Sequence, residues 1–147
     1  MIDQKTAPYA IALLRVTLGV FAIAHLYWKF FVLPTGFNGW WTNLNNNGYP
    51  NWVVVYVLSG EFLGALLLIP GIWARWVALY SMPLIVGAAQ YWIVRKGYFF
   101  TDAGAELPTL WAIGLIVLAG LGDGAYALVP SPPFPFIHSK HRPMPAE

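Results

Sequence analysis

Four long apolar stretches, separated by short polar or turn-forming segments, dominate the pattern of hydrophobic and polar positions along the chain. They cover approximately residues 8–33, 52–71, 76–94 and 107–129. A hydrocarbon core about 30 Å thick takes about 20 helical residues to cross, so each stretch is long enough to span a membrane. The pattern predicts an all-α integral membrane protein that is built as a four-helix bundle.

Residues typical of helix ends bound these stretches. Pro8 suits a first helical turn, and Pro34 and Pro70, each close to a glycine, stop the first two spans. The segment at residues 35–51 has no charged side chain and is rich in Asn and Trp. We expect it to be an outer loop that can close over the bundle as a lid. Pro83 is predicted to kink the third span and to leave room that a ligand can use.

Composition supports a membrane location and excludes several other classes of protein. The 147 residues are 59% hydrophobic and 10% charged, which is more apolar surface than one small water-soluble core can hide. Eight basic and six acidic residues are too sparse for the basic footprint of a nucleic-acid-binding protein. The absence of cysteine excludes thiolate catalysis, cysteine-ligated iron–sulfur clusters and covalent c-type haem. We therefore expect the lipid bilayer as a partner, and no nucleic acid.

The basic residues beside the spans predict the orientation of the chain. One side carries both termini with Lys5, Arg75, Lys140 and Arg142, and the other carries Arg95 and Lys96. Positive charge gathers on the cytoplasmic side, so both termini are predicted to be cytoplasmic. We expect a multi-pass cell-membrane protein of a bacterial inner membrane, with a four-span domain at residues 1–129. Residues 130–147 are predicted to form a Pro-rich cytoplasmic tail that either docks onto a larger complex or is disordered.

Ionisable side chains inside the apolar stretches are the strongest functional signal. Glu61 lies near the middle of the second span, and the first span carries Arg15, His25 and Lys29. Such groups are costly at membrane depth, so they usually face a protein interior or a water-filled cavity and have partners. His25 and Lys29, four residues apart, share one helix face at a height that Gln90 of the third span also reaches. We predict an outer polar pocket formed by His25, Lys29, Gln90 and Glu61.

A second polar contact is predicted closer to the cytoplasmic face. At about 1.5 Å of rise per residue, Arg15 lies about 10 Å into the first span, and Asp123 lies at a similar depth in the fourth. Arg15 and Asp123 are therefore predicted to form a structural ion pair. The pairs Gly60/Gly64 and Gly120/Gly124 have the G-x-x-x-G spacing that lets membrane helices pack closely.

Several of these residues occur in an order that resembles the DoxX family. The resemblance covers about residues 10–128 and is carried by Arg15 with Gly19, His25 with Lys29, Glu61 with Gly64, Gly71 with Arg75, and Gly122-Asp123-Gly124-Ala125-Tyr126. It implies a small four-helix membrane protein. It also implies a link to quinone reduction, because the DoxD-type subunit of thiosulfate:quinone oxidoreductase is among the relatives.

The function predicted from these residues is quinone binding within a redox or respiratory assembly. A quinone needs an apolar slot, a hydrogen-bond donor for each carbonyl and a protonatable group nearby. Glu61 and His25 are the candidate catalytic residues; His25 and either Lys29 or Gln90 can hold the quinone carbonyls. Arg15 either stabilises a reduced anion or only holds Asp123. The sequence shows no redox centre, so other membrane protein subunits are expected as partners.

Each candidate residue also has a structural interpretation. Lys29 can snorkel to the interface, His25 can be a packing residue, and Glu61 can be a protonated group that bonds between helices. Two further functions stay open: a noncatalytic accessory subunit of a larger complex, and a small transporter or proton path. Haem is not expected because His25 is the only histidine within a span, and His138 with His141 makes too small a ligand set for a metal.

Overall fold

The computed structural model describes residues 3–134 and confirms the predicted all-α class. Within these residues there is no strand; a single isolated bridge joins Ile72 to Val129. In chain order the elements are α1 (Ala7–Tyr27), the π-helix η1 (Trp28–Val32), α2 (Gly36–Asn46), α3 (Asn51–Leu63), the π-helix η2 (Gly64–Leu68), α4 (Ala74–Lys96), the 3-10 helix η3 (Phe100–Asp102) and α5 (Glu106–Leu121).

Three helical stretches are long and apolar enough to cross a membrane: Ala7–Val32, Asn51–Leu68 and Ala74–Lys96. The fourth apolar helix, α5, has only 16 residues. The prediction of a fourth helix that runs to residue 129 is therefore wrong. α5 ends because Gly122 adopts a positive φ of 94°, which turns the chain out of the helix. Glycine adopts this conformation readily because it has no side chain.

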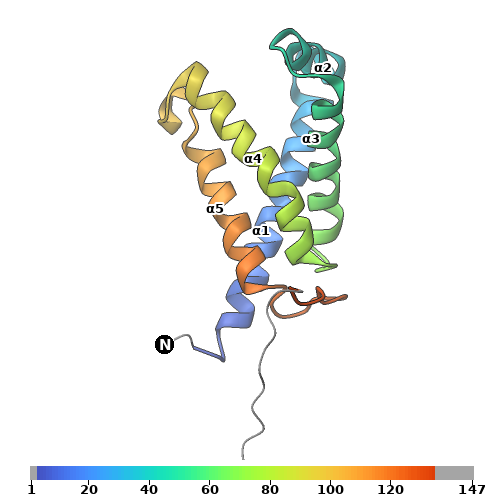
Figure 1. Cartoon of the computed structure of the whole chain (residues 1–147), viewed down its shortest axis with the longest axis vertical. Helices are drawn as coiled ribbons and strands as arrows, with labels where there is room; N and C mark the ends of the chain where they lie inside the picture. Colours follow the sequence, from blue (N-terminus) through green and yellow to red (C-terminus); the bar gives the residue numbers. More distant parts are fainter. Residues whose placement is uncertain (1–2, 135–147) are drawn as a thin grey trace, which may run out of the picture.

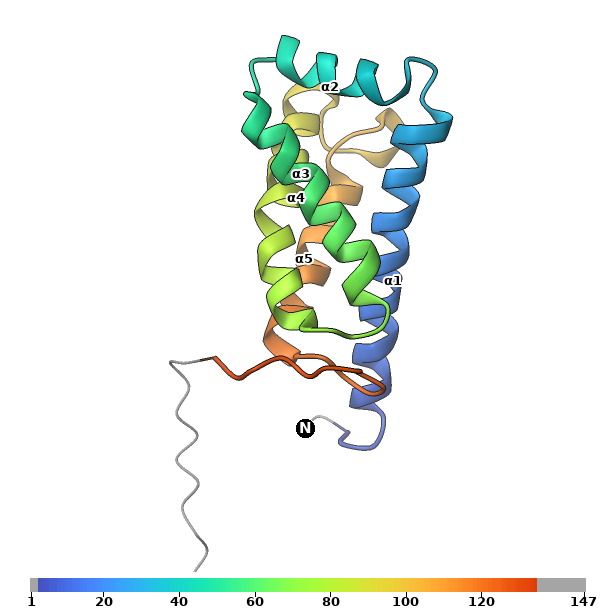
Figure 2. The same cartoon turned by 90° about the vertical axis from the view of Figure 1, so that its right-hand side faces the viewer.

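The long helices run side by side along the molecule, and α2 lies across one of its ends (Figures 1 and 2). The N-terminal residues and the segment after α5 lie at the opposite end (Figure 2). We call these the α2 end and the terminal end. Toward the α2 end the pair α4 and α5 diverges from α1 and α3 (Figure 1).

The predicted outer loop at residues 35–51 contains helix α2, which is a correction. Its apolar side chains recur at helical spacing on one side: Phe37, Trp40, Trp41 and Leu44 are all partly buried, whereas the Asn residues are exposed. This segregation is typical of an amphipathic helix lying flat on an apolar body. Its charge-free composition did not distinguish such a helix from a loop.

The buried core lies mainly between the terminal end and the middle of the bundle. It includes Leu18, Ala22, Leu68, Ala78, Leu115 and Leu118. Small residues bring the helices close: a Cβ added to Gly64 would lie 3.2 Å from the Cβ of Ala22, and Gly60 lies directly against Leu84. The close packing expected for the Gly60/Gly64 pair is thus present between α1, α3 and α4.

Candidate functional site

A buried ion pair joins the first and second spans. Lys29 Nζ donates to both carboxylate oxygens of Glu61, and 4% and 5% of the two side chains is exposed. Within residues 3–134 this is the only salt bridge. Lys29 therefore turns inward to a carboxylate and does not snorkel to the interface. Breaking such a pair is costly, because one charge is left in a low-dielectric interior without its partner.

Each member of the pair lies in a π-helical turn or one turn away from one. Lys29 is part of the π-helix η1, and Glu61 lies on α3 one turn before the π-helix η2. A π-helical turn holds more residues than an α-helical turn, so it rotates the side chains that follow it onto another face. Such turns are rare and often occur at functional sites.

A large cavity lies at the α2 end. Lys29 lines it, whereas Glu61 does not. The cavity has a volume of about 790 Å³, within the range of small-molecule sites of about 300–1,000 Å³. Side chains of α1, η1, α2, α3 and α4 line it, and most of its exposed surface is apolar. Aromatic residues dominate the wall: Trp28, Trp40, Tyr49, Trp52, Tyr56, Tyr91 and Trp92. Pro83 and Gly87 of α4 leave the room that the sequence led us to expect beside this helix.

Helix α2 covers the ion pair. The Trp40 ring lies over Lys29 Nζ, 4.3 Å from it, which is a cation–π contact. Two contacts join α2 and the residue after it to the end of α4: Asn43 Nδ2 donates to the Tyr91 hydroxyl at 3.4 Å, and Arg95 donates to Asn47 Oδ1 at 2.6 Å. The sequence alone did not single out Trp40 or its contact with Lys29, because no spacing rule links the two helices.

His25 lines the same cavity, one helical turn from Lys29. Its ring packs edge-on against Trp111, with ring centroids 4.8 Å apart. Its nitrogens make no hydrogen bond to the described residues, so they are available to a ligand. Gln90 is different: it does not line the cavity, although the sequence predicted it there. Depth along the helix predicts a residue's height but not its face, and Gly87, Ala88 and Tyr91 take the cavity face of α4.

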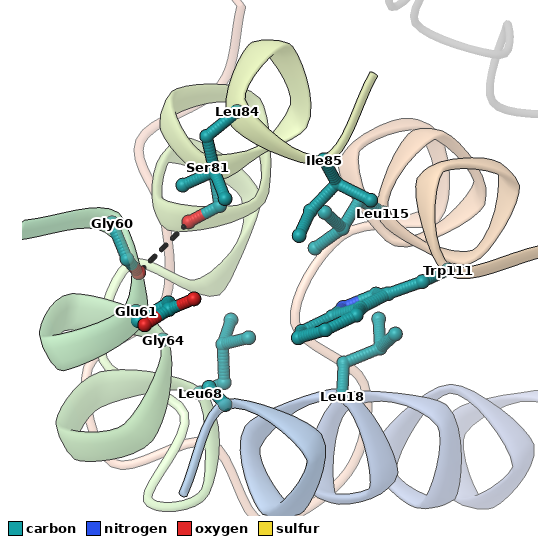
Figure 3. A pocket seen from close by; sticks show the side chains of 11 residues that line it. Leu18, Gly60, Glu61, Gly64, Leu68, Ser81, Leu84, Ile85, Trp111 and Leu115 are labelled. Atoms are coloured by element: carbon teal, nitrogen blue, oxygen red, sulfur yellow. Dashed lines mark hydrogen bonds between the residues drawn. The ribbon is translucent and has the colours of Figure 1, made fainter. Parts of the chain in front are cut away.

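Glu61 lines a second, much smaller space, and Lys29 is not part of its lining (Figure 3). This void has a volume of about 10 Å³, close to the least that holds one water molecule. Its lining is mostly apolar, with Leu18, Leu68, Trp111 and Leu115 around the carboxylate (Figure 3). Ser81 is the other polar side chain there, and its hydroxyl donates to the Gly60 carbonyl at 3.2 Å.

Arg15 lies at the terminal end and does not line the cavity. Its guanidinium is buried and donates to the main-chain carbonyls of Asp123, Ala125 and Tyr126 at 2.9, 3.2 and 3.4 Å. The predicted side-chain ion pair with Asp123 is therefore corrected: Arg15 contacts Asp123 through its backbone. A guanidinium carries five donors, and the irregular segment after α5 offers carbonyls without helical partners.

The Asp123 carboxylate has other partners. It accepts hydrogen bonds from the backbone N–H of Ala74 at 2.9 Å, and from the N–H and hydroxyl of Ser131, both at 2.7 Å. It thus satisfies an amide at the start of α4, where helical partners are lacking. Arg15 and Asp123 together clasp the segment after α5 to α1 and α4. The candidate metal ligands His138 and His141 lie outside the described residues.

Comparison with known proteins completes the description. Neither the curated proteins nor the solved structures give a match. The profile of the DoxX family matches residues 10–96, more than half of the chain. This range contains Lys29, Glu61 and helices α2 and α3, whereas α5 and Asp123 lie beyond it. The family resemblance seen in the sequence is thereby confirmed, and this chain, a membrane protein with three long apolar helices, belongs to the DoxX family.

Proposed function

We propose that the chain is a quinone-binding subunit of a membrane redox assembly, and that the cavity at the α2 end takes the quinone head group. One observation carries the proposal: a cavity of about 790 Å³ with aromatic walls has a buried Lys29–Glu61 pair and a free imidazole at its edge. An apolar pocket with a few convergent polar groups is the usual form of a small-molecule site.

The residues of the cavity fit a flat ring with a carbonyl at each end. Tryptophan and tyrosine side chains from α2, α3 and α4 offer faces for stacking and an apolar route for a lipid tail. His25 on α1 offers an N–H to one carbonyl. The Tyr91 hydroxyl on α4 can donate a hydrogen bond to the second carbonyl, because in its contact with Asn43 it acts only as an acceptor. In this proposal Tyr91 takes the role for which the sequence offered either Lys29 or Gln90.

A bound quinone takes up two electrons and two protons when it is reduced to a quinol. The chain itself supplies groups that hold protons: the Lys29 ammonium, the Glu61 carboxylate and the His25 imidazole, all at or directly beneath the cavity. The electrons come from a partner subunit in this proposal, because the sequence has no cysteine to ligate an iron–sulfur cluster.

Native mass spectrometry of the protein, extracted in mild detergent from its own membrane, tests the proposal. We expect one quinone per chain in the wild type, and loss of most of it in His25→Ala and in Tyr91→Phe. Gln90→Ala is the matched control, because this residue lies outside the cavity wall, and it should keep the quinone. A chain that retains partner subunits and only lipid would contradict quinone binding and support the accessory-subunit function.

A further inference from the structure

We propose that Glu61 is a proton-exchange site that opens only toward the α2 end, so that protons reach it through the cavity and never from the terminal end. The charge pattern predicts that the α2 end faces away from the cytoplasm. The inference deepens the proposed function, on which it rests for its biological role, by naming the side of the membrane that supplies or receives the quinone's protons.

Lys29 is the polar link between Glu61 and the cavity. Lys29 lines the cavity, whereas Glu61 lines only the small void on the other side. Both carboxylate oxygens accept from Lys29 Nζ, so the ammonium stands between the carboxylate and the cavity. The exposed Asn43 of α2 also lines the cavity. The cavity therefore has a polar edge at the α2 end.

Proton exchange across this link needs two transfers that balance in atoms and charge. Lys29 Nζ gives a proton to a Glu61 oxygen, which leaves a neutral amine beside a carboxylic acid. The amine then takes a proton from a water molecule in the cavity and becomes an ammonium again. The net result is one proton moved from the cavity to Glu61, and the reverse sequence releases it.

The other side of Glu61 offers one polar side chain, the Ser81 hydroxyl, whose proton is already donated to the Gly60 carbonyl. The void there holds at most about one water molecule. Leu18, Leu68 and Leu115 of its lining, and Leu118 one turn further along α5, are each at most 3% exposed. Figure 3 shows Leu18, Leu68 and Leu115 around the space that the Glu61 carboxylate lines. A proton needs polar groups or water for each transfer, so this layer is a barrier.

Arg15 is the next ionisable group toward the terminal end, and it cannot continue a path. Its guanidinium donates to three main-chain carbonyls, and arginine keeps its proton in proteins. The carbonyls that it contacts accept hydrogen bonds but do not take up a proton at ordinary pH. The terminal end is thus closed by a layer of leucines and then by a clasp that does not exchange protons.

Single cysteines test the inference directly, because the natural chain has none and each introduced thiol is the only one. Ala88 lines the cavity, and Ala78 is fully buried; both lie on α4, about 15 Å apart along the helix. A charged, membrane-impermeant methanethiosulfonate is added to one side of vesicles that contain the whole chain. Asn46→Cys on α2 and Lys5→Cys at the terminal end report how the chain is oriented.

We expect Ala88→Cys to react at least about ten times faster from the α2 side than from the terminal side, and Ala78→Cys to react from neither. Labelling of Ala78→Cys from the terminal side would overturn the inference, and so would an Ala88→Cys that does not react from the α2 side. If Ala78→Cys fails to fold, Ala119→Cys on α5 asks the same question, because Ala119 is also buried in this layer.

Proton flux gives a second readout. Vesicles with the wild-type chain and an imposed pH gradient should lose it no faster than protein-free vesicles, whereas faster loss would mean that a path crosses the bundle and would overturn the inference. Neither readout uses a quinone. One-sided labelling of a chain that binds no quinone would therefore contradict the proposed function alone, and a quinone-binding chain labelled from the terminal side would contradict the inference alone.

Discussion

The two ends of the bundle each hold a buried cation from the first span, and the two cations have different hydrogen-bond partners. At the α2 end Lys29 pairs with the Glu61 carboxylate and borders a cavity of about 790 Å³. At the terminal end Arg15 donates to main-chain carbonyls and is surrounded by packed chain. The difference shows that an ionisable residue within a span is a functional candidate only where it has both an exchangeable partner and adjoining space.

The chemistry of the partner explains the contrast. A carboxylate can accept a proton from an ammonium, so the Lys29–Glu61 pair has two accessible proton arrangements. A main-chain carbonyl can only accept a hydrogen bond, and a guanidinium stays charged, so the Arg15 clasp has one. The α2 end is suited to binding and proton exchange, and the terminal end to holding the helices together. Four predictions test this division.

The largest effect is expected at the ion pair. Glu61→Leu leaves Lys29 buried without its partner and should lower the free energy of unfolding by about 3–5 kcal/mol. Adding Lys29→Met removes the stranded charge, so the double variant should return to within about 1 kcal/mol of the wild type. Thermal unfolding in detergent measures both. A double variant as unstable as Glu61→Leu would show that the pair's geometry, and not its charge balance, stabilises this end.

At the terminal end, Gly71→Ala should lower the free energy of unfolding by about 2–5 kcal/mol. Gly71 has a φ of 72°, and an added Cβ would lie 2.5 Å from Arg15 Cζ and 2.8 Å from Ala127 Cα. Denaturant titration measures the loss. Gly120→Ala is the matched control, because nothing lies within 4 Å of its added Cβ, and its stability should not fall. Equal losses in the two variants would contradict a tight clasp.

A smaller effect is expected for the cap of α4. Asp123→Ala removes the acceptor for Ala74 and Ser131 and should cost about 0.5–2 kcal/mol. Hydrogen exchange should speed up first at the amides of Ala74 and Ser131 and leave α2 unchanged. Asp102 lies in the connection between α4 and α5 and its side chain makes no hydrogen bond to the described residues, so Asp102→Ala should be neutral. Faster exchange in α2 would mean that the two ends are coupled.

An effect as small as that of Asp123→Ala is expected at helix α2. Trp40→Leu removes the ring over Lys29. The loss of this cation–π contact should lower the free energy of unfolding, or the free energy of ligand binding, by about 0.5–2 kcal/mol. For a quinone in the cavity this corresponds to a dissociation constant raised about two- to thirty-fold. Trp73→Leu, at the terminal end, should leave the dissociation constant unchanged. An unchanged constant in Trp40→Leu would remove α2 from the binding site.

Much of the fold could be predicted from hydrophobic pattern alone. Runs of apolar residues about 20 long, bounded by Pro8, Pro34 and Pro70, predict spanning helices because the bilayer demands that length and internal backbone hydrogen bonding. The two elements that depart from the prediction, helix α2 and the end of α5, do not follow that rule. α2 lies on the bundle rather than across it, and α5 ends at Leu121 because Gly122 and the Asp123 contacts turn the chain.

The candidate site could be predicted only in part. The free-energy cost of placing an ionisable side chain at membrane depth singles out Glu61, His25 and Lys29, since such a group usually needs a partner. Gln90 shows where this reasoning stops. Its height along α4 matched the pocket, but its face did not, and one residue along a helix changes the direction of a side chain by about 100°.

By itself, the sequence determined the class of the protein, its family and the few ionisable residues whose burial requires an explanation. Only the tertiary structure decided which cation has a carboxylate partner, that Trp40 covers it, and that the space lies above the pair and a leucine layer below it. Hydrophobicity and spacing are properties of one segment and can be read along the chain. A partner and a cavity arise only from how segments distant in the chain are packed together.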